Sequence, residues 1–191
     1  WAYYAQYIDF MLREPASQPY LDLRSLIGHK DYFILSTNVD TQVEKTFPAE
    51  RTCNYQGSFA HLQCKQPCCD EIFDASPYVP RCPYCGWQLV PWVRDDTFLQ
   101  GTAWREGLER YEHFVRERGS SRVLLLELCV GEMTPGIITL PFWSMTAKLP
   151  DAHLLSVNIS GDSAPLQLGS KAEAIQADLR TLLSAARAGD E

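Results

Sequence analysis

The sequence of 191 residues lacks the glycine-rich loops that bind nucleotide phosphates: neither G-x-G-x-x-G nor G-x4-G-K-[ST] occurs. Any nucleotide ligand would therefore need a further segment to hold its phosphates. No apolar run approaches the 18 residues of a membrane span, and no signal peptide is recognisable. The net charge of -7 leaves no basic stripe, which argues against general nucleic-acid binding.

Internal repeats and low-complexity tracts are also absent, and the length suffices for one large domain or a domain with a small insert. Seven cysteines are an odd number, and long helical stretches accompany them, so a secreted disulfide scaffold is disfavoured. We expect a reducing, cytoplasmic environment with metal-bound thiolates. The chain begins at Trp1, within an apolar helical pattern, which favours a fragment of a longer protein.

Four of the cysteines form two close pairs. Cys64 and Cys68 have the spacing C-x3-C, whereas Cys82 and Cys85 have the spacing C-x2-C and precede a glycine, as in zinc knuckles. Tetrahedral Zn²⁺ takes four soft ligands, and two short turns supply them. The sequence therefore predicts a structural zinc ion with four thiolate ligands, and its spacing leaves Cys69 open as an alternative to Cys68.

Strand patterns alternate with helix patterns along most of the chain. Apolar runs predict strands at 32–35, 52–55, 123–128 and 153–159, and helical spacing predicts helices at 1–12, 20–27, 40–47, 102–118 and 171–186. This order implies an α/β fold with a mostly parallel sheet. Residues 59–90 contain the cysteine pairs and four prolines but no long periodic run. We predict an insert held by its metal and not by a core of its own, which divides the chain into 1–58, 59–90 and 91–191.

Polar side chains follow the predicted strands, at the position where parallel sheets bind ligands. Thr37, Asn38 and Asp40 lie in STNVD after the first strand. Asn38 and Asp40 could hold a sugar hydroxyl and an amide; a turn role for Asn38 and helix capping by Asp40 are the structural alternatives. Gly131 and Thr134 follow the third strand, in a loop that contains glycine and proline.

Gln56 follows the second strand, directly before the insert. An amide cannot act as a general base, but it can hydrogen-bond a bound ribose; an exposed glutamine without a function is the alternative. Asn158, at the end of the fourth strand, could contact a ribose or form an Asx turn. Glu127 is either paired with another group or part of the site. For His61 and His153 we favour structural roles.

The order of these motifs resembles that of the sirtuins over nearly the whole chain. Sirtuins have a T-Q-N-I-D strand end, a His-Gly, a four-cysteine zinc module, a G-T-S loop and a late strand that ends in Asn. Their counterparts here are STNVD at 36–40, Gln56-Gly57, the four cysteines, LCVGEMTPG at 128–136, and Val157-Asn158. The resemblance implies a Rossmann-like fold with a zinc-binding insert, and it places the half with the phosphate loop before Trp1.

Two departures from the sirtuin pattern bear on activity. Gln56 stands where sirtuin deacylases have their general-base histidine, and the G-T-S loop has become the longer ELCVGEMTPG. Both features, with the Cys64-x3-Cys68 spacing, resemble the macrodomain-linked (class M) microbial sirtuins. That likeness implies transfer of ADP-ribose from NAD⁺ to a protein, in systems with lipoylated carrier proteins and a macrodomain hydrolase that reverses the modification.

The resemblance also implies roles for individual residues. Asn38 would hold the nicotinamide ribose, and Asp40 would bind the nicotinamide carboxamide. Gln56 would orient a ribose hydroxyl without taking its proton, which favours transfer over deacylation. The other cofactor-binding residues implied are Thr37, Gly131 and Thr134 beside the cofactor, Asn158 at the adenine-side ribose and Lys171 beside the adenine.

The first hypothesis is therefore an NAD-dependent protein ADP-ribosyltransferase, of which this fragment alone is expected to have little or no activity. One alternative is an NAD-dependent lysine deacylase, which would produce O-acyl-ADP-ribose from an acyl-peptide. The other is a non-catalytic, zinc-bearing nucleotide-binding module, which would bind NAD⁺ without releasing nicotinamide or labelling a protein.

Overall fold

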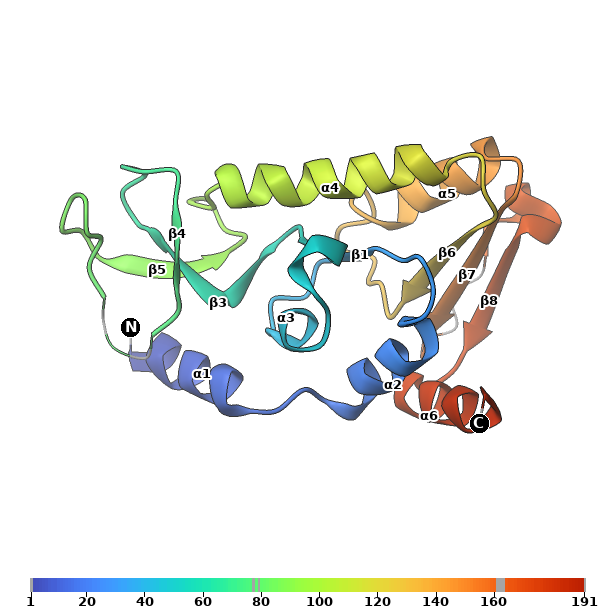
Figure 1. Cartoon of the computed structure of the whole chain (residues 1–191), viewed down its shortest axis with the longest axis horizontal. Helices are drawn as coiled ribbons and strands as arrows, with labels where there is room; N and C mark the ends of the chain where they lie inside the picture. Colours follow the sequence, from blue (N-terminus) through green and yellow to red (C-terminus); the bar gives the residue numbers. More distant parts are fainter. Residues whose placement is uncertain (1, 77, 79, 161–163, 191) are drawn as a thin grey trace. The chain divides into compact units, whose positions relative to one another are not determined.

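The computed structural model describes residues 2–76, 78, 80–160 and 164–190, so Trp1, the predicted start of the first helix, lies outside the described residues. The chain divides into two compact units, Trp1–Glu112 and His113–Glu191 (Figure 1). Over the described ranges, no helix is long and apolar enough to cross a bilayer. The predicted division of the chain at residues 58 and 90, around an insert, stays a prediction.

The first unit begins with the helices α1 (Ala2–Arg13) and α2 (Gln18–Ile27), close to their predicted bounds. A parallel pair of strands follows, β1 (Ile34–Ser36) and β2 (Thr52–Asn54), in which Ser36 pairs with Asn54. The helix α3 (Gln42–Thr46) and the 3-10 turn η1 (Ala49–Arg51) connect the two strands. The carboxyl ends of β1 and β2 therefore lie side by side.

The helix that follows STNVD is shorter than the predicted 40–47. Its N-cap position is Thr41, which has a φ of 66°, and not Asp40. Asp40 Oδ1 accepts a hydrogen bond from the Gln42 N–H at 3.1 Å. Asp40 therefore forms an Asx turn that leads into α3. Because such a turn also precedes a helix, the sequence predicted Asp40 as the cap, one residue before the observed N-cap.

The cysteine-containing segment forms an antiparallel sheet in the order β4–β3–β5. Its strands are β3 (Gly57–Cys64), β4 (Ile72–Asp74) and β5 (Leu89–Val93). Phe59, Leu62 and Leu89 of this sheet pack in one apolar cluster with Ile8 of α1. The sequence predicted no core of the insert's own, and in the structure its apolar residues pack together with Ile8, which lies far earlier in the sequence.

Helix α4 (Thr102–Arg118) contains the boundary between the two units and has the bounds that the sequence predicts. The second unit has a parallel sheet in the order β6–β7–β8, with β6 (Val123–Leu128), β7 (Ala152–Asn158) and β8 (Ala172–Gln176). Helix α5 (Thr139–Lys148) packs against β6 and β7, and α6 (Leu179–Asp190) follows β8. The sheets formed by β1–β2 and by β6–β8 confirm an α/β fold with mainly parallel sheets.

Two parts of the second unit differ from the prediction. Helix α5 was not among the predicted helices, and Pro141 lies in its first turn. The predicted helix at 171–186 is instead the 3-10 turn η2 (Leu166–Lys171), strand β8 and the shorter α6. Ala174 and Ile175 lie in β8, where hydrogen bonds to β7 override their helical spacing.

Candidate functional site

Four cysteine sulfurs converge in the first unit. The Sγ atoms of Cys64, Cys68, Cys82 and Cys85 all lie within 4.8 Å of one another. Neighbouring sulfurs are 3.5 Å apart for Cys64–Cys85 and Cys68–Cys82, and 3.6 Å apart for Cys64–Cys68. Zn–S bonds of about 2.3 Å in a tetrahedron give an S···S edge of about 3.8 Å. The four thiols therefore fit a zinc ion.

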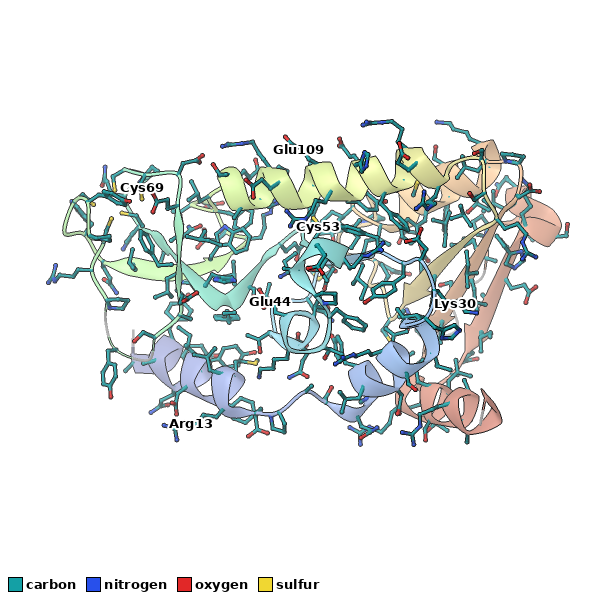
Figure 2. The ribbon with its side chains drawn as sticks, viewed as in Figure 1. Arg13, Lys30, Glu44, Cys53, Cys69 and Glu109 are labelled. Atoms are coloured by element: carbon teal, nitrogen blue, oxygen red, sulfur yellow. The ribbon has the colours of Figure 1, made fainter. Side chains whose placement is uncertain are left out.

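The structure selects Cys68, and not Cys69, for this group. Of these two cysteines, Cys68 places its sulfur in the group of four, whereas Cys69 packs against the apolar cluster that contains residues of β3 and β5. Sulfur atoms gather in this part of the first unit beside the labelled Cys69 (Figure 2). The directions of these two adjacent side chains therefore decide between Cys68 and Cys69.

The second cysteine pair lies in a tight turn that suits metal binding. Gly86 has a φ of 73° and donates its N–H to the Cys82 carbonyl at 2.9 Å. Burial raises the pKa of the Cys82 thiol, but hydrogen bonds from the backbone N–H groups of Cys85 and Tyr84 and from the thiols of Cys68 and Cys85 together lower the pKa to about 6. A thiol with a low pKa is readily available as the thiolate that zinc requires.

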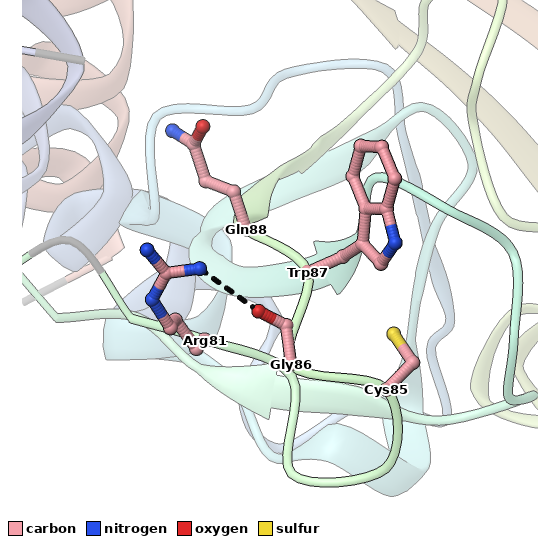
Figure 3. Close-up of a pocket in the computed structure, with 5 residues that line it drawn as sticks. All are labelled: Arg81, Cys85, Gly86, Trp87 and Gln88. Carbon is pink, nitrogen blue, oxygen red and sulfur yellow. Dashed lines mark hydrogen bonds between the residues drawn. The ribbon is translucent and has the colours of Figure 1, made fainter.

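A shallow cavity of about 440 Å³ lies on the outer side of this turn (Figure 3). It is lined by Arg81, Cys85, Gly86, Trp87 and Gln88. Arg81 Nη1 donates a hydrogen bond to the Gly86 carbonyl at 3.0 Å, and this bond closes the turn from outside. The cavity thus belongs to the metal-binding turn.

Asn38 and Gln56 each follow a carboxyl end of the β1–β2 sheet. Ser36 and Asn54 are the last paired residues of the two parallel strands, and Asn38 and Gln56 each lie two residues further on. The Tyr55 N–H also donates to the Ser36 carbonyl at 2.9 Å. Two side-chain amides that lie 18 positions apart in sequence (56 − 38) thus follow neighbouring strand ends, where open sheets bind ligands.

The Asn38 side chain is exposed but held in place. Asn38 Nδ2 donates a hydrogen bond to the Tyr20 hydroxyl at 2.8 Å, and the Asn38 N–H donates to Ser36 Oγ at 3.1 Å. Thr37 and Asp40 are half-buried on either side of it. In the described contacts the Asn38 side chain bonds Tyr20 and closes no turn of its own, and its amide lies at the surface.

The turn that contains Gln56 is fixed by backbone hydrogen bonds. The Arg94 N–H donates to the Gln56 carbonyl at 3.0 Å, and the Trp104 indole N–H donates to the Tyr55 carbonyl at 2.9 Å. Gly57 has a φ of 81°, and a Cβ there would lie 2.0 Å from the Trp92 carbonyl oxygen. The backbone beside Gln56 therefore has one conformation, and only glycine fits it at the next position.

In the second unit, Gly131 and Asn158 lie at the carboxyl edge of the β6–β7–β8 sheet. Asn158 Nδ2 donates to the Val130 carbonyl at 3.2 Å, and this bond ties the end of β7 to the loop after β6. A cavity of about 500 Å³ opens at this edge. Its lining includes Gly131, the buried Glu127 and the hydroxyl-bearing Ser156, between the apolar side chains of Leu140 and Trp143.

Thr134 and Lys171 lie outside this cavity. Thr134 is exposed in the loop after β6, where its carbonyl accepts a hydrogen bond from the Ile137 N–H. Lys171 precedes β8 and so lies at the amino end of that strand, opposite to Asn158. Its ammonium group donates to the carbonyls of Leu149 at 2.8 Å and Thr146 at 3.4 Å, at the C-terminal end of α5.

The residues at the carboxyl edge of β8 were missed because a helix was predicted there. The strand ends at Gln176, whose side chain donates to the Ile159 carbonyl at 3.2 Å, and Ala177 donates its N–H to the Asn158 carbonyl. Asp178 accepts hydrogen bonds from the Thr181 N–H and hydroxyl, which lower the pKa of its carboxyl group. Asp178 is an N-terminal capping signal that could have divided the predicted helix at this point.

The fold of this chain is similar to those of solved Sir2 homologues. A Sir2 homologue in complex with NAD superimposes with a TM-score of 0.69 at 17% identity, over 98% of this chain and 69% of that one. A variant Sir2 homologue bound to ADP-ribose also gives 0.69, at 16% identity over 99% and 72% of the two chains. The chain has the sirtuin fold. No family model matches its sequence.

Two curated relatives of this sirtuin-like chain bear ADP-ribosyltransferase names. A protein ADP-ribosyltransferase of Staphylococcus aureus (strain Mu50 / ATCC 700699) is 25% identical over 211 residues, covering 100% of this chain and 67% of the relative. A probable bifunctional ADP-ribose hydrolase/ADP-ribosyltransferase of Fusarium oxysporum f. sp. cubense is 23% identical over 167 residues, covering 74% of this chain and 28% of the relative.

Proposed function

We propose that this sirtuin-like chain contributes the nicotinamide-ribose end of the active site of an NAD-dependent protein ADP-ribosyltransferase. The observation that carries the proposal is the placement of Asn38 and Gln56 at the adjacent ends of β1 and β2. An amide there can orient a ribose hydroxyl but cannot accept its proton, so the site favours group transfer over base-dependent deacylation. The names of both curated relatives support the same activity.

The proposed reaction needs little acid–base chemistry from the chain. The bond between ribose C1′ and the nicotinamide nitrogen breaks, and its electron pair leaves with nicotinamide. A nucleophilic side chain of the acceptor forms the new bond to C1′ and loses its proton to solvent. In this scheme Asn38 holds the ribose, Asp40 binds the carboxamide of nicotinamide, and Gln56 orients the ribose hydroxyl.

We assign the remaining cofactor contacts to residues that lie at the carboxyl edges of the two parallel sheets. Thr37 adjoins Asn38, and in the second unit Gly131, Thr134 and Asn158 supply the cofactor-binding residues of that sheet edge. Lys171 lies at the other end of β8 and is left out of the proposed site. The four cysteines would hold a structural zinc, which would fix the two cysteine turns and leave no open position for substrate.

We further propose that the acceptor is a lipoylated carrier protein and that a macrodomain hydrolase removes the modification. The name of the Staphylococcus relative supports a protein acceptor. The bifunctional name of the Fusarium relative supports a link between transfer and hydrolysis of ADP-ribose. Both partners are tested separately from the transfer reaction itself.

The test incubates the full-length natural protein with radiolabelled NAD⁺ and a lipoylated carrier protein. We expect label on the carrier, its loss in Asn38→Ala and its retention in the control Gln167→Ala, which alters an exposed side chain of η2. O-acyl-ADP-ribose from an acyl-peptide would instead indicate a deacylase. NAD⁺ binding without nicotinamide release or labelling would indicate a non-catalytic module.

A further inference from the structure

Glu44 belongs to α3 (Figure 2). Its carboxylate accepts hydrogen bonds from both sides of the turn that contains Gln56. Asn54 Nδ2 donates to Oε1 at 2.9 Å, and Ser58 Oγ donates to Oε2 at 2.5 Å. Asn54 is the last residue of β2, and Ser58 is the second residue of β3. One side chain therefore links the two strands that enter and leave the Tyr55–Gly57 turn.

These contacts are of the strong kind. Ser58 is only 1% exposed, and hydrogen bonds to an ionised carboxylate are about twice as strong as those between neutral groups. His61 of β3 places its Nε2 3.3 Å from Glu44 Oε1, and its Nδ1 lies 3.8 Å from Asp74 of β4. Every donor around Glu44 that the described structure shows thus comes from β2 or β3.

The helix that carries Glu44 lies close in the chain to the Asn38 segment, which is bonded to β3. Helix α3 follows Asp40 after one residue, Thr41, and the Phe59 N–H of β3 donates to the Val39 carbonyl at 3.0 Å. A displacement of the strands at Glu44 would therefore change the distance between the Asn38 and Gln56 amides. Neither amide touches Glu44 in the described contacts, so its effect on them is indirect.

We propose that Glu44 is a positioning residue, which fixes the Tyr55–Gly57 turn so that the Gln56 amide faces the bound ribose. The catalytic consequence rests on the proposed function. Because a misplacement of about 1 Å can cost about 100-fold in rate, we expect Glu44→Ala to lower kcat by about 10- to 100-fold. The KM for NAD⁺ should change less, since Asn38 and Asp40 keep their own hydrogen bonds.

A double-mutant cycle in the full-length protein tests whether Glu44 acts through Gln56. Nicotinamide release is measured for Glu44→Ala, Gln56→Ala and the double variant, with Glu50→Ala as the control for loss of an exposed carboxylate in η1. We expect no further loss of kcat from Glu44→Ala once Gln56 is alanine. Glu44→Gln should recover part of the rate, because its one carbonyl oxygen can accept one of the two hydrogen bonds. Multiplicative losses, or an unchanged kcat in Glu44→Ala, would overturn the proposal.

Amide hydrogen exchange tests the same proposal without any activity. The Tyr55 amide donates to the Ser36 carbonyl, so its exchange rate reports opening of the turn. We expect exchange at Tyr55 about tenfold faster in Glu44→Ala than in Glu50→Ala, with Leu62 in the centre of β3 unchanged as the measure of folding. Unchanged exchange at Tyr55 would overturn the positioning role. Absence of nicotinamide release in the wild type would instead contradict the proposed function and leave this measurement intact.

Discussion

Gly57 offers a sharp test of the geometry around Gln56. It has a φ of 81°, and a Cβ at this residue would lie 2.0 Å from the Trp92 carbonyl oxygen and 2.9 Å from Cε2 of Phe98. Gly86 has nearly the same φ, 73°, but a Cβ there meets nothing within 4 Å. Alanine at Gly86 therefore adds backbone strain alone, whereas alanine at Gly57 adds the same strain and a collision with backbone.

The magnitudes follow from these two contributions. A left-handed conformation costs a residue with a Cβ about 1–2 kcal/mol, which is the full expected loss of unfolding free energy for Gly86→Ala. Overpacking adds about 1–3 kcal/mol, so Gly57→Ala should lose about 2–5 kcal/mol. Since small domains are stable by only about 5–15 kcal/mol, the second variant is expected to be marginal.

Urea denaturation followed by tryptophan fluorescence measures both variants. With a slope of about 1–3 kcal/mol per molar urea, the midpoint of Gly57→Ala should fall below that of Gly86→Ala by about 1 M. Equal midpoints for the two variants would refute the close approach of Trp92 to Gly57, and with it the conformation assigned to the turn of Gln56.

Three further predictions concern the metal site, α5 and a buried thiol. The chain should bind one zinc ion, measured by elemental analysis, which Cys64→Ser loses and Cys69→Ser keeps; loss in Cys69→Ser would contradict the ligand set. Lys171→Met should lower the free energy of unfolding by about 0.3–1 kcal/mol by uncapping α5, and a weaker Kd for NAD⁺ would show that Lys171 belongs to the site after all. Burial raises the pKa of Cys53 from 9.0 to about 11, so the stability from burying the neutral thiol is present below pH 9 and is lost as the pH rises through about 11. The decline of at most about 1.4 kcal/mol per pH unit should be smaller in Cys53→Ala, and an equal decline would argue against burial.

Local pattern was sufficient where one element has one clear period. Helix α4 and strand β6 have their predicted bounds, because the apolar face of the helix and the continuous apolar run of the strand are both unambiguous. The sequence also predicted Asn38 and Gln56 just after two strands, and the parallel pairing of β1 with β2 puts the carboxyl ends of those strands at one edge. The four thiols converge because short turns fix the two members of each cysteine pair.

Tertiary contacts decided what local pattern could not. The residues of β8 include alanine, glutamate and glutamine, which favour helices, and become a strand through their hydrogen bonds to β7. The core of the cysteine segment needs Ile8, which no inspection of residues 59–90 reveals. Glu44 has no motif around it, and its contacts with Asn54 and Ser58 exist only in the folded chain.

The central claim is that a glutamine at this position directs the reaction to transfer of ADP-ribose. Mass spectrometry of the products tests it most directly, with the full-length protein, NAD⁺, a lipoylated carrier protein and an acyl-peptide in one mixture. We expect carrier protein with one added ADP-ribose group, free nicotinamide and an unchanged acyl-peptide. Deacylated peptide with O-acyl-ADP-ribose, and an unmodified carrier, would contradict it.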